Sequence, residues 1–379
     1  MLCFTDRFNI SVVQRITCPL LQLTNIYNST AGQKIQACKP NINHDASAKC
    51  ATKLQNRKVP NGLSPSTMIP YSNIYSELYS PRNYIVQDSC KVQPWLALIK
   101  ADQYESSYCK AVFSKWLSVN DKTPEYPPPK SPPHDMLSQY TLNSYLTVSE
   151  FYRNDVSSKN LFNWTTQLIE QTLQQVKIRQ NFYYGEETQL LYNAMSAIDL
   201  SGKQAAVIGS LTPWVEAILL NRNAAKVTTI EYSTILTSDA RIESAYPLDV
   251  ARRVLNGSQP TFDFIATFSS LEHAGLGRYG DVLDPFGDVV EMQKCWCLLN
   301  EGGLFMVGLP MGLDHIAWNA HRIYGPLRLP MMTAGFEVVA LFTPESSFPF
   351  NWTTLGDDQW AFPTGVGVHI QRLMILRKL

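Results

Sequence analysis

Short apolar runs alternate with amphipathic stretches through the second half of the chain. The runs have strand length and strand composition, and they predict strands at 204–208, 227–231, 262–267, 303–308, 335–342 and 367–376. The stretches between them predict helices near 213–221, 234–244, 286–299 and 325–333, preceded by amphipathic helices at 161–178 and 186–198. Such alternation favours a mostly parallel sheet with helices on both faces.

The connection between the last two predicted strands differs from the others. Residues 343–366 are rich in Pro, Gly and aromatic residues and show no helix pattern. Parallel neighbours need a crossover connection, so we expect these two strands to pair antiparallel. The predicted fold class is α/β, a Rossmann-like mixed sheet that is mostly parallel, has an antiparallel last strand and is flanked by helices. A sheet closed in this way resembles class I S-adenosylmethionine-dependent methyltransferases.

The first part of the chain shows less regular patterning. Residues 1–70 are polar without periodicity, and we expect them to be poorly ordered. Residues 71–150 form an expected extension, with helical spacing of apolar residues over 92–119 and a proline-rich extended linker over 124–133. The methyltransferase-like domain is predicted over 160–379.

The first strand–helix–strand unit predicts a nucleotide-like ligand. An apolar run ends at Gly209, a helix follows, and a second apolar run delivers the acid Glu231. Glycine lets the backbone approach a ligand closely, the helix start offers free N–H groups, and the acid can accept hydrogen bonds from ribose hydroxyls. The candidate cofactor-binding residues here are Gly209, Ser210, Glu216, Glu231 and Tyr232.

The third strand is followed by Ser269, Ser270, Leu271, Glu272 and His273. This segment resembles the Leu-Glu-His turn that packs beside the cofactor in class I methyltransferases. The resemblance implies cofactor contacts for Ser270, Leu271 and Glu272. The sequence leaves open a second interpretation, in which local hydrogen bonds merely stabilise a turn.

Two polar loops follow, over 275–288 and 308–325, and both are expected at the carboxyl edge of the sheet, where open α/β sheets bind ligands. Three of the six histidines fall in or beside these loops, and we predict them as candidate catalytic bases: His273, His315 and His321. The candidate substrate-binding residues are Arg278, Tyr279, Asp281, Asp284, Asp314, Asn319, Arg322 and Tyr324.

Four motifs, VIGSLTPWVEAILL, IEYS, SSLEHAGLGRYGDVLDPFGD and GLPMGLDHIAWNAHRIYGPLRLP, resemble the uncharacterised domain-of-unknown-function family 268. The resemblance covers roughly residues 180–345 and leaves out the N-terminal half. That family is similar to class I methyltransferases in fold and has no established reaction. The resemblance therefore implies a fold and adds little biochemical detail.

One departure keeps alternatives open. Methyltransferase cofactor loops usually carry two or three glycines, whereas Gly209 stands alone and the bulky Trp214 follows it. The leading hypothesis is an S-adenosylmethionine-dependent methyltransferase acting on a small polar metabolite or sugar. A non-catalytic binding or scaffold protein on the same fold is the alternative. A nicotinamide-dependent sugar-modifying enzyme ranks lowest, because no GxGxxG motif is present.

Composition narrows the partners. The 32 basic and 32 acidic residues give a formal net charge of +0, which disfavours a nucleic-acid partner. No stretch is apolar enough for a transmembrane segment, and no Cys/His spacing predicts a metal site. The expected partner is a small-molecule substrate. The sequence does not specify the oligomeric state.

The cysteines and the asparagines point to different compartments. Six of the eight cysteines precede residue 110, and reduced, mostly buried thiols are the preferred interpretation, which favours a cytoplasmic location. Five N-glycosylation sequons keep a secretory-pathway location open, at Asn9, Asn28, Asn163, Asn256 and Asn351.

Overall fold

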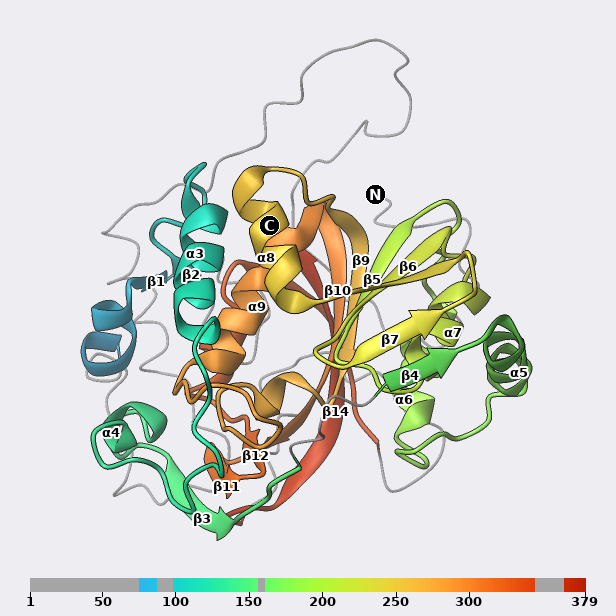
Figure 1. The fold of residues 1–379 in the computed structure, drawn as a ribbon. Helices are drawn as coiled ribbons and strands as arrows, with labels where there is room; N and C mark the ends of the chain where they lie inside the picture. Colours follow the sequence, from blue (N-terminus) through green and yellow to red (C-terminus); the bar gives the residue numbers. More distant parts are fainter. Residues whose placement is uncertain (1–74, 87–97, 156–160, 345–364) are drawn as a thin grey trace, which may run out of the picture.

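A computed structural model describes residues 75–86, 98–155, 161–344 and 365–379. Its centre is a seven-stranded sheet with the order β13-β14-β10-β9-β5-β6-β8 (Figure 1). The strands are β5 (Gln204–Ile208), β6 (Lys226–Ile230), β8 (Ile242–Ala245), β9 (Phe262–Phe268), β10 (Leu299–Gly312), β13 (Phe336–Phe342) and β14 (His369–Lys378). The prediction of poor order for residues 1–70 lies outside the described residues.

The sheet is mixed in the way the sequence predicts. β8, β6, β5, β9 and β10 pair in parallel, whereas β14 runs antiparallel to both β10 and β13. The last strand is thus antiparallel, but it lies inside the sheet, between β10 and β13, rather than at its edge. The predicted class, a Rossmann-like mixed sheet that is mostly parallel and flanked by helices, is confirmed.

Helices cover both faces, as Figure 1 shows. α5 (Thr166–Lys177), α6 (Thr188–Ser196) and α7 (Trp214–Asn221) pack on one face, and α3 (Tyr108–Asn120), α8 (Pro247–Asn256) and α9 (Gly287–Leu298) pack on the other. Strand side chains alternate between the two cores. In β5, Val207 joins the core under α7, and its neighbour Ala206 joins the core under α8 and α9.

The helix predicted at 234–244 is wrong. These residues contribute β7 (Thr234–Thr237) and the start of β8. In β7 the buried Ile235 lies between the exposed Thr234 and Leu236, which is the alternation of a strand. The real helix, α8, begins immediately afterwards. Its boundaries carry a sequence signature that the periodicity missed: Pro247 stands in the first turn, and Gly257, at φ +77°, ends the helix.

Two other helix predictions are wrong at their N-terminal ends. In the stretch 92–119, Leu98–Lys100 forms strand β2, which pairs with β1 (Tyr84–Val86), and the helix α3 follows. In the stretch 161–178, Leu161–Trp164 forms strand β4, which pairs with β7. Extended pairing with a distant segment overrides the local helix pattern in both cases.

The remaining elements are short. They are the π-helix η2 (Tyr75–Tyr79), the 3-10 helices η3 (Ser80–Arg82) and η4 (Leu271–His273), α4 (Leu137–Tyr140), β3 (Thr147–Phe151), β11 (His315–Asn319), β12 (His321–Ile323) and α10 (Leu329–Met332). The proline-rich segment has no helix or strand, as predicted, and it packs on the domain. The carbonyl of Pro129 accepts a hydrogen bond from Trp318 Nε1 at 2.9 Å.

The prediction of reduced thiols is wrong for two cysteines. Cys109, in α3, and Cys297, in α9, form a disulfide with their Cα atoms 5.5 Å apart. Cys295 is free and buried. The sequence pattern hid this pair because its members are 188 residues apart. Cys3, Cys18, Cys38, Cys50 and Cys90 lie outside the described residues. Within the described ranges, no helix has the length and apolar character needed to cross a membrane.

Candidate functional site

The carboxyl ends of β5, β6 and β9 meet at one edge of the sheet, and Gly209 marks the meeting point. Its backbone has φ +71°, and its N–H donates to the carbonyl of Ile230 at 3.1 Å. A Cβ atom at this position would lie 2.0 Å from Ser270 Oγ. Only glycine fits, because the conformation is left-handed and the turn after β5 touches the turn after β9.

Glu231 follows β6 at the same edge. Its Oε1 accepts the N–H of Ser233 at 2.9 Å. Burial raises the pKa of this carboxyl, while the backbone N–H groups of Ser233, Tyr232 and Ser210 act in the opposite direction. The carboxyl therefore lies between the end of β6 and the glycine turn. Tyr232 is half exposed, and its ring meets that of Tyr246 edge-on, with the centroids 5.9 Å apart.

Glu216 lies beneath the turn and is fully buried. Its two oxygens accept hydrogen bonds from Thr229 Oγ1 at 2.8 Å and from Ser210 Oγ at 3.1 Å. Burial raises its pKa to about 7. Trp214 is buried too, with its ring 5.7 Å from Phe182 and 5.8 Å from Phe268 between centroids. Both side chains belong to α7 and hold its first turn against the interior of the protein.

Glu272, in η4, has a carboxyl that is only half satisfied. The side chain is 2% exposed, and Oε1 accepts the hydroxyl of Ser269 at 2.6 Å. Within the part of the chain that the structure describes, Oε2 is buried and has no hydrogen-bond partner. Burial raises the pKa of Glu272 to about 7. A buried carboxyl with one open oxygen and a pKa near neutrality is suited to binding or accepting a proton.

His273 is held in one tautomer. Its Nδ1 lies 2.6 Å from the carbonyl oxygen of Ala320, which can only accept, so Nδ1 carries the proton. Burial, followed by the positive charge of Arg278, lowers the pKa of His273 to about 3. The ring is therefore neutral near pH 7. Its bare Nε2 lies 3.7 Å from Glu272 Oε1.

Arg278 and Tyr279 lie next to this pair, at the rim. Arg278 pairs with Asp155 at 2.8 Å and also donates to the carbonyl of Ala320 at 3.1 Å. The ring of Tyr279 is 46% exposed and meets the ring of His273 edge-on at 5.3 Å. The arginine is already paired, whereas the tyrosine presents an open face to solvent.

The other two predicted catalytic histidines lie on β11 and β12. Both ring nitrogens of His315 are engaged at 2.8 Å, with Thr147 Oγ1 and Ser149 Oγ on β3. His321 stacks edge-on with His369 at 5.1 Å, and burial followed by the charge of His369 lowers its pKa to about 4. His273 belongs to the Leu-Glu-His turn itself, whereas His315 and His321 lie on β11 and β12, so a joint role of the three histidines as bases remains a prediction.

Three predicted substrate-binding acids hold loop backbone. Asp281 accepts the N–H groups of Gly275 at 2.6 Å and Gly277 at 3.2 Å. Asp284 accepts the N–H of Phe286 at 2.8 Å. The third acid, Asp314, accepts three N–H groups, those of Gly325, Leu327 and Arg328. Each closes a turn, so a substrate contact by these side chains stays untested.

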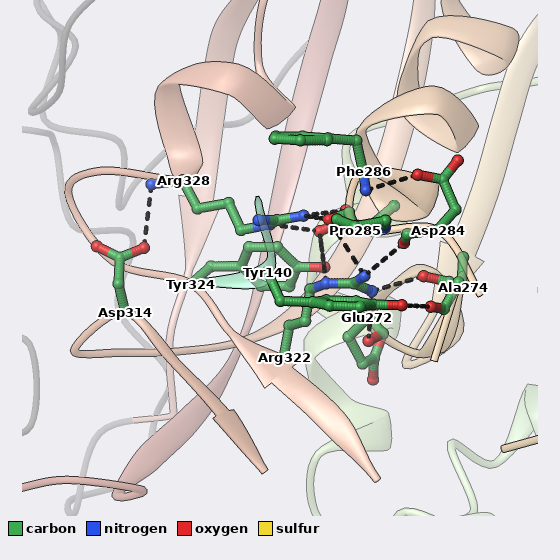
Figure 2. Close-up of polar contacts among 12 residues, drawn as sticks. Tyr140, Glu272, Ala274, Asp284, Pro285, Phe286, Asp314, Arg322, Tyr324 and Arg328 are labelled. Atoms are coloured by element: carbon green, nitrogen blue, oxygen red, sulfur yellow. Dashed lines mark hydrogen bonds and ion pairs between the residues drawn. The ribbon is translucent and has the colours of Figure 1, made fainter. Parts of the chain in front are cut away.

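Arg322 and Tyr324 lie inside the loop packing, as Figure 2 shows. Arg322 donates to the carbonyls of Ala274 at 2.6 Å and Asp284 at 3.1 Å, and so ties β12 to the loop after β9. The Tyr324 hydroxyl donates to Asp288 at 2.9 Å. The fully buried pair of Arg328 and Asp288 completes the network. These residues support the site from behind.

Asn319 is fully buried, and its Oδ1 accepts the N–H of Arg153 at 2.8 Å. Leu271 is buried in the core beneath η4. The structure thus brings Gly209, Ser210, Glu231, Ser270 and Glu272 to one edge with His273 and Tyr279, and it assigns most of the other predicted residues to loop support.

Sequence reasoning missed three contributors to this edge. Ser269, at φ +50°, donates to Glu272. The hydroxyl of Tyr184 hydrogen-bonds to Ser269, and burial raises the pKa of Tyr184 to about 12. Asp155 pairs with Arg278. Ser269 is the first residue of the motif SSLEHAGLGRYGDVLDPFGD, whereas nothing in the sequence marks the distant Tyr184 or Asp155. Among the described residues, no group of three or more His, Cys, Asp or Glu side chains could hold a metal ion.

Comparison with known families supports the motif-based resemblance. The model of a family described as a Caenorhabditis protein of unknown function, DUF268, matches residues 202–379. The resemblance predicted over 180–345 is thereby confirmed from residue 202 onward, and the match continues through β14 to residue 379. No curated protein matches the chain.

Solved structures with a similar arrangement are distant. The N-methyltransferase NodS from Bradyrhizobium japonicum, solved with S-adenosylhomocysteine, is 15% identical with a TM-score of 0.34, over 56% of this chain and 97% of that one. A protein described as a hemolysin from Streptococcus thermophilus is 16% identical with a TM-score of 0.35, over 52% and 68%. At such low TM-scores these likenesses add no argument about activity.

Proposed function

We propose that the chain binds S-adenosylmethionine and transfers its methyl group to a hydroxyl of a small polar metabolite or sugar. One observation carries the proposal: the glycine turn, the acid after β6 and the half-satisfied Glu272 meet at the carboxyl edge of a sheet with an antiparallel inserted strand. Open α/β sheets bind ligands at this edge. Because fold does not establish function, the proposal rests on these residues.

The residues at the edge fit an adenosyl ligand in three respects. Gly209 and Ser270 form a contact too close for any side chain at position 209, so the turn after β5 and the turn after β9 lie directly against each other at this edge. Glu231 offers a carboxylate suited to two ribose hydroxyls. Glu272 Oε2 is buried and unpartnered among the described residues, and it suits an ammonium group or a hydroxyl.

When bound, S-adenosylmethionine would supply an electrophilic methyl group on a sulfonium. The chain must align the acceptor hydroxyl and exclude water. We assign the acceptor's proton to Glu272, whose pKa of about 7 matches that task better than the pKa of about 3 of His273. His273 stays neutral and orients the acceptor through its bare Nε2. The half-exposed ring of Tyr279 would pack against the acceptor's apolar face.

The test is titration calorimetry with S-adenosylhomocysteine on the folded native chain, Glu231→Gln and a matched control. The control is Glu243→Gln, on β8, where the acid is solvent-accessible and pairs with Lys226. Loss of the charge-assisted ribose contacts should weaken binding of Glu231→Gln by about 10- to 100-fold. The control should bind like the native chain. Equal affinity in all three proteins would remove the assignment of Glu231.

A non-catalytic binding or scaffold protein is the second candidate. The lone Gly209 favours it, and so does Glu231, since this carboxyl already accepts a backbone N–H in the structure. A folded native chain that binds no S-adenosylhomocysteine at millimolar concentration would establish this alternative over methyl transfer. Transfer of label from methyl-labelled S-adenosylmethionine to a polar metabolite fraction, abolished in Glu272→Gln, would exclude it.

A further inference from the structure

Asn256 combines a glycosylation sequon with an exposed and ordered position. It is the last residue of α8 and is followed by Gly257 and Ser258, so the sequence reads Asn-Gly-Ser. Asn256 and Ser258 are both exposed. The Asn256 side chain has turned back on the sequon, since Oδ1 accepts the N–H of Ser258 at 3.0 Å and its hydroxyl at 2.6 Å. Both contacts use the oxygen, so they leave the amide nitrogen Nδ2 for reaction.

An independent observation concerns the compartment. The disulfide between Cys109 and Cys297 joins two helices on the face of the sheet that also carries α8. Disulfides persist in secreted proteins and in the lumen of the secretory pathway, and they are rare in the cytosol. The same oxidising compartment is where asparagine sequons are glycosylated. The sequon and the disulfide therefore indicate the same compartment.

We infer that the chain is a secretory-pathway protein and that Asn256 carries an N-linked glycan. In the reaction, Asn256 Nδ2 forms a bond to the anomeric carbon of a lipid-diphosphate-linked oligosaccharide. The bond from that carbon to the diphosphate oxygen breaks, the lipid diphosphate leaves with the electron pair, and the amide nitrogen loses one proton. The lipid-linked oligosaccharide is the donor, and a glycosyltransferase of the host membrane catalyses the transfer.

The position of Asn256 keeps a glycan away from the candidate site. α8 precedes β9, so its last residue lies at the amino edge of the parallel strands, whereas Gly209 and Ser270 lie at the carboxyl edge. In Figure 1, α8 and the C-terminal end of β14 lie toward the same end of the sheet. A glycan here would shield the loop between α8 and β9 and leave ligand access open. The inference does not rest on the proposed activity.

The experiment uses the tagged full chain isolated from the cells that express it. Peptide N-glycosidase treatment in heavy-oxygen water converts a glycosylated Asn256 to labelled aspartate, which peptide mass spectrometry detects. Asn256→Gln and Ser258→Ala should lose the mass of one glycan on gels, and Ser258→Thr should keep it. Asn223→Gln, an exposed asparagine outside any sequon, is the matched control and should not shift.

A second readout keeps the compartment testable on its own. Digestion without reduction should yield the linked peptides of Cys109 and Cys297. A wholly unmodified Asn256 peptide from source cells overturns the modification site, and a gel shift that persists in Ser258→Ala does the same. Cys109 that alkylates without prior reduction overturns the oxidising compartment.

Discussion

At the residue scale, Glu216 couples the fold to pH. Its pKa is about 7 in the folded chain, against an ordinary value of 4.5, because burial disfavours the charged form. Between these values the folded state holds the extra proton, so the free energy of unfolding falls as pH rises from 4.5 through 7. Glu216→Gln removes this loss. The difference in free energy of unfolding, variant minus native chain, should therefore rise by about 3 kcal/mol as the pH increases from 4.5 to 7.

The measurement is urea unfolding of both proteins at a series of pH values, compared as a difference so that other titrating groups cancel. The control is Glu337→Gln, a solvent-accessible acid paired with Arg377 on β13 and β14. This substitution removes only an exposed ion pair, so it should change the free energy of unfolding by less than about 1 kcal/mol. Parallel curves for Glu216→Gln would show that the carboxyl is ionised at little cost.

The residues of the candidate site differ in how far the sequence could predict them. Gly209 and Glu231 follow from a local pattern, because a turn and a strand end are local features. The role of Arg322 does not follow from a local pattern. The sequence predicts a substrate contact, but the side chain donates its hydrogen bonds to carbonyls of a loop some forty residues away. Which polar group faces a cavity and which supports a loop depends on tertiary packing that periodicity does not contain.

Asp288 leads from the residue to the element scale, since it joins α9 to the segments carrying Tyr324 and Arg328. It is fully buried and accepts two hydrogen bonds from Arg328, at 2.6 and 2.8 Å, and one from Tyr324. Asp288→Asn leaves buried arginine charge without its counterion. We expect the free energy of unfolding to fall by about 3–5 kcal/mol.

Chemical denaturation checks this value against Asp249→Asn, the same substitution in an exposed pair with Arg252 at 3.0 Å. The exposed pair should contribute less than about 1 kcal/mol. Similar losses in the two variants would mean that the buried network is no stronger than a surface ion pair.

The disulfide links α3 to α9. Cys109 lies in α3 and Cys297 in α9, and the closed loop spans 188 residues of sequence separation. Closing a long loop restricts the unfolded chain, so the Cys109→Ser/Cys297→Ser double variant should lose about 2–5 kcal/mol. Thermal unfolding under oxidising conditions measures this. Reductant should lower the melting temperature of the native chain and of Cys295→Ala, but not that of the double variant. A reductant-insensitive native chain contradicts the bond.

At the scale of the whole molecule, the sequence predicted the class of the sheet better than it predicted which strands lie next to each other. The sequence between the last two strands has no helix pattern, and this predicted antiparallel pairing because parallel strands need a crossover. Nothing local indicated that β14 lies between β10 and β13, or that β3 pairs with β11 across more than 160 residues. Strand order depends on which apolar faces bury one another, and that is decided only in the assembled molecule.

β14 offers a test of this architecture of one sheet between two cores, because its side chains alternate between the two cores. Leu373 lies in the core with α5, α6 and α7, and Leu376 lies in the core with α3, α8 and α9. Both are fully buried, so each Leu→Ala variant should lose about 2–5 kcal/mol through lost contacts and a cavity. The two sites lie about 10 Å apart on opposite faces. The double variant should therefore lose the sum, within about 0.5 kcal/mol.

Urea unfolding of the native chain, both single variants and the double variant completes the cycle. Val368→Ala is the control, a 51% exposed residue just before the strand, and it should change stability by less than about 0.5 kcal/mol. An interaction energy well above about 1 kcal/mol would mean that the two cores relax together, as one body, around β14. Additive losses mean that the two cores pack independently on the two faces of the sheet. A substitution in the core beneath α9 then leaves the glycine turn before α7 in place.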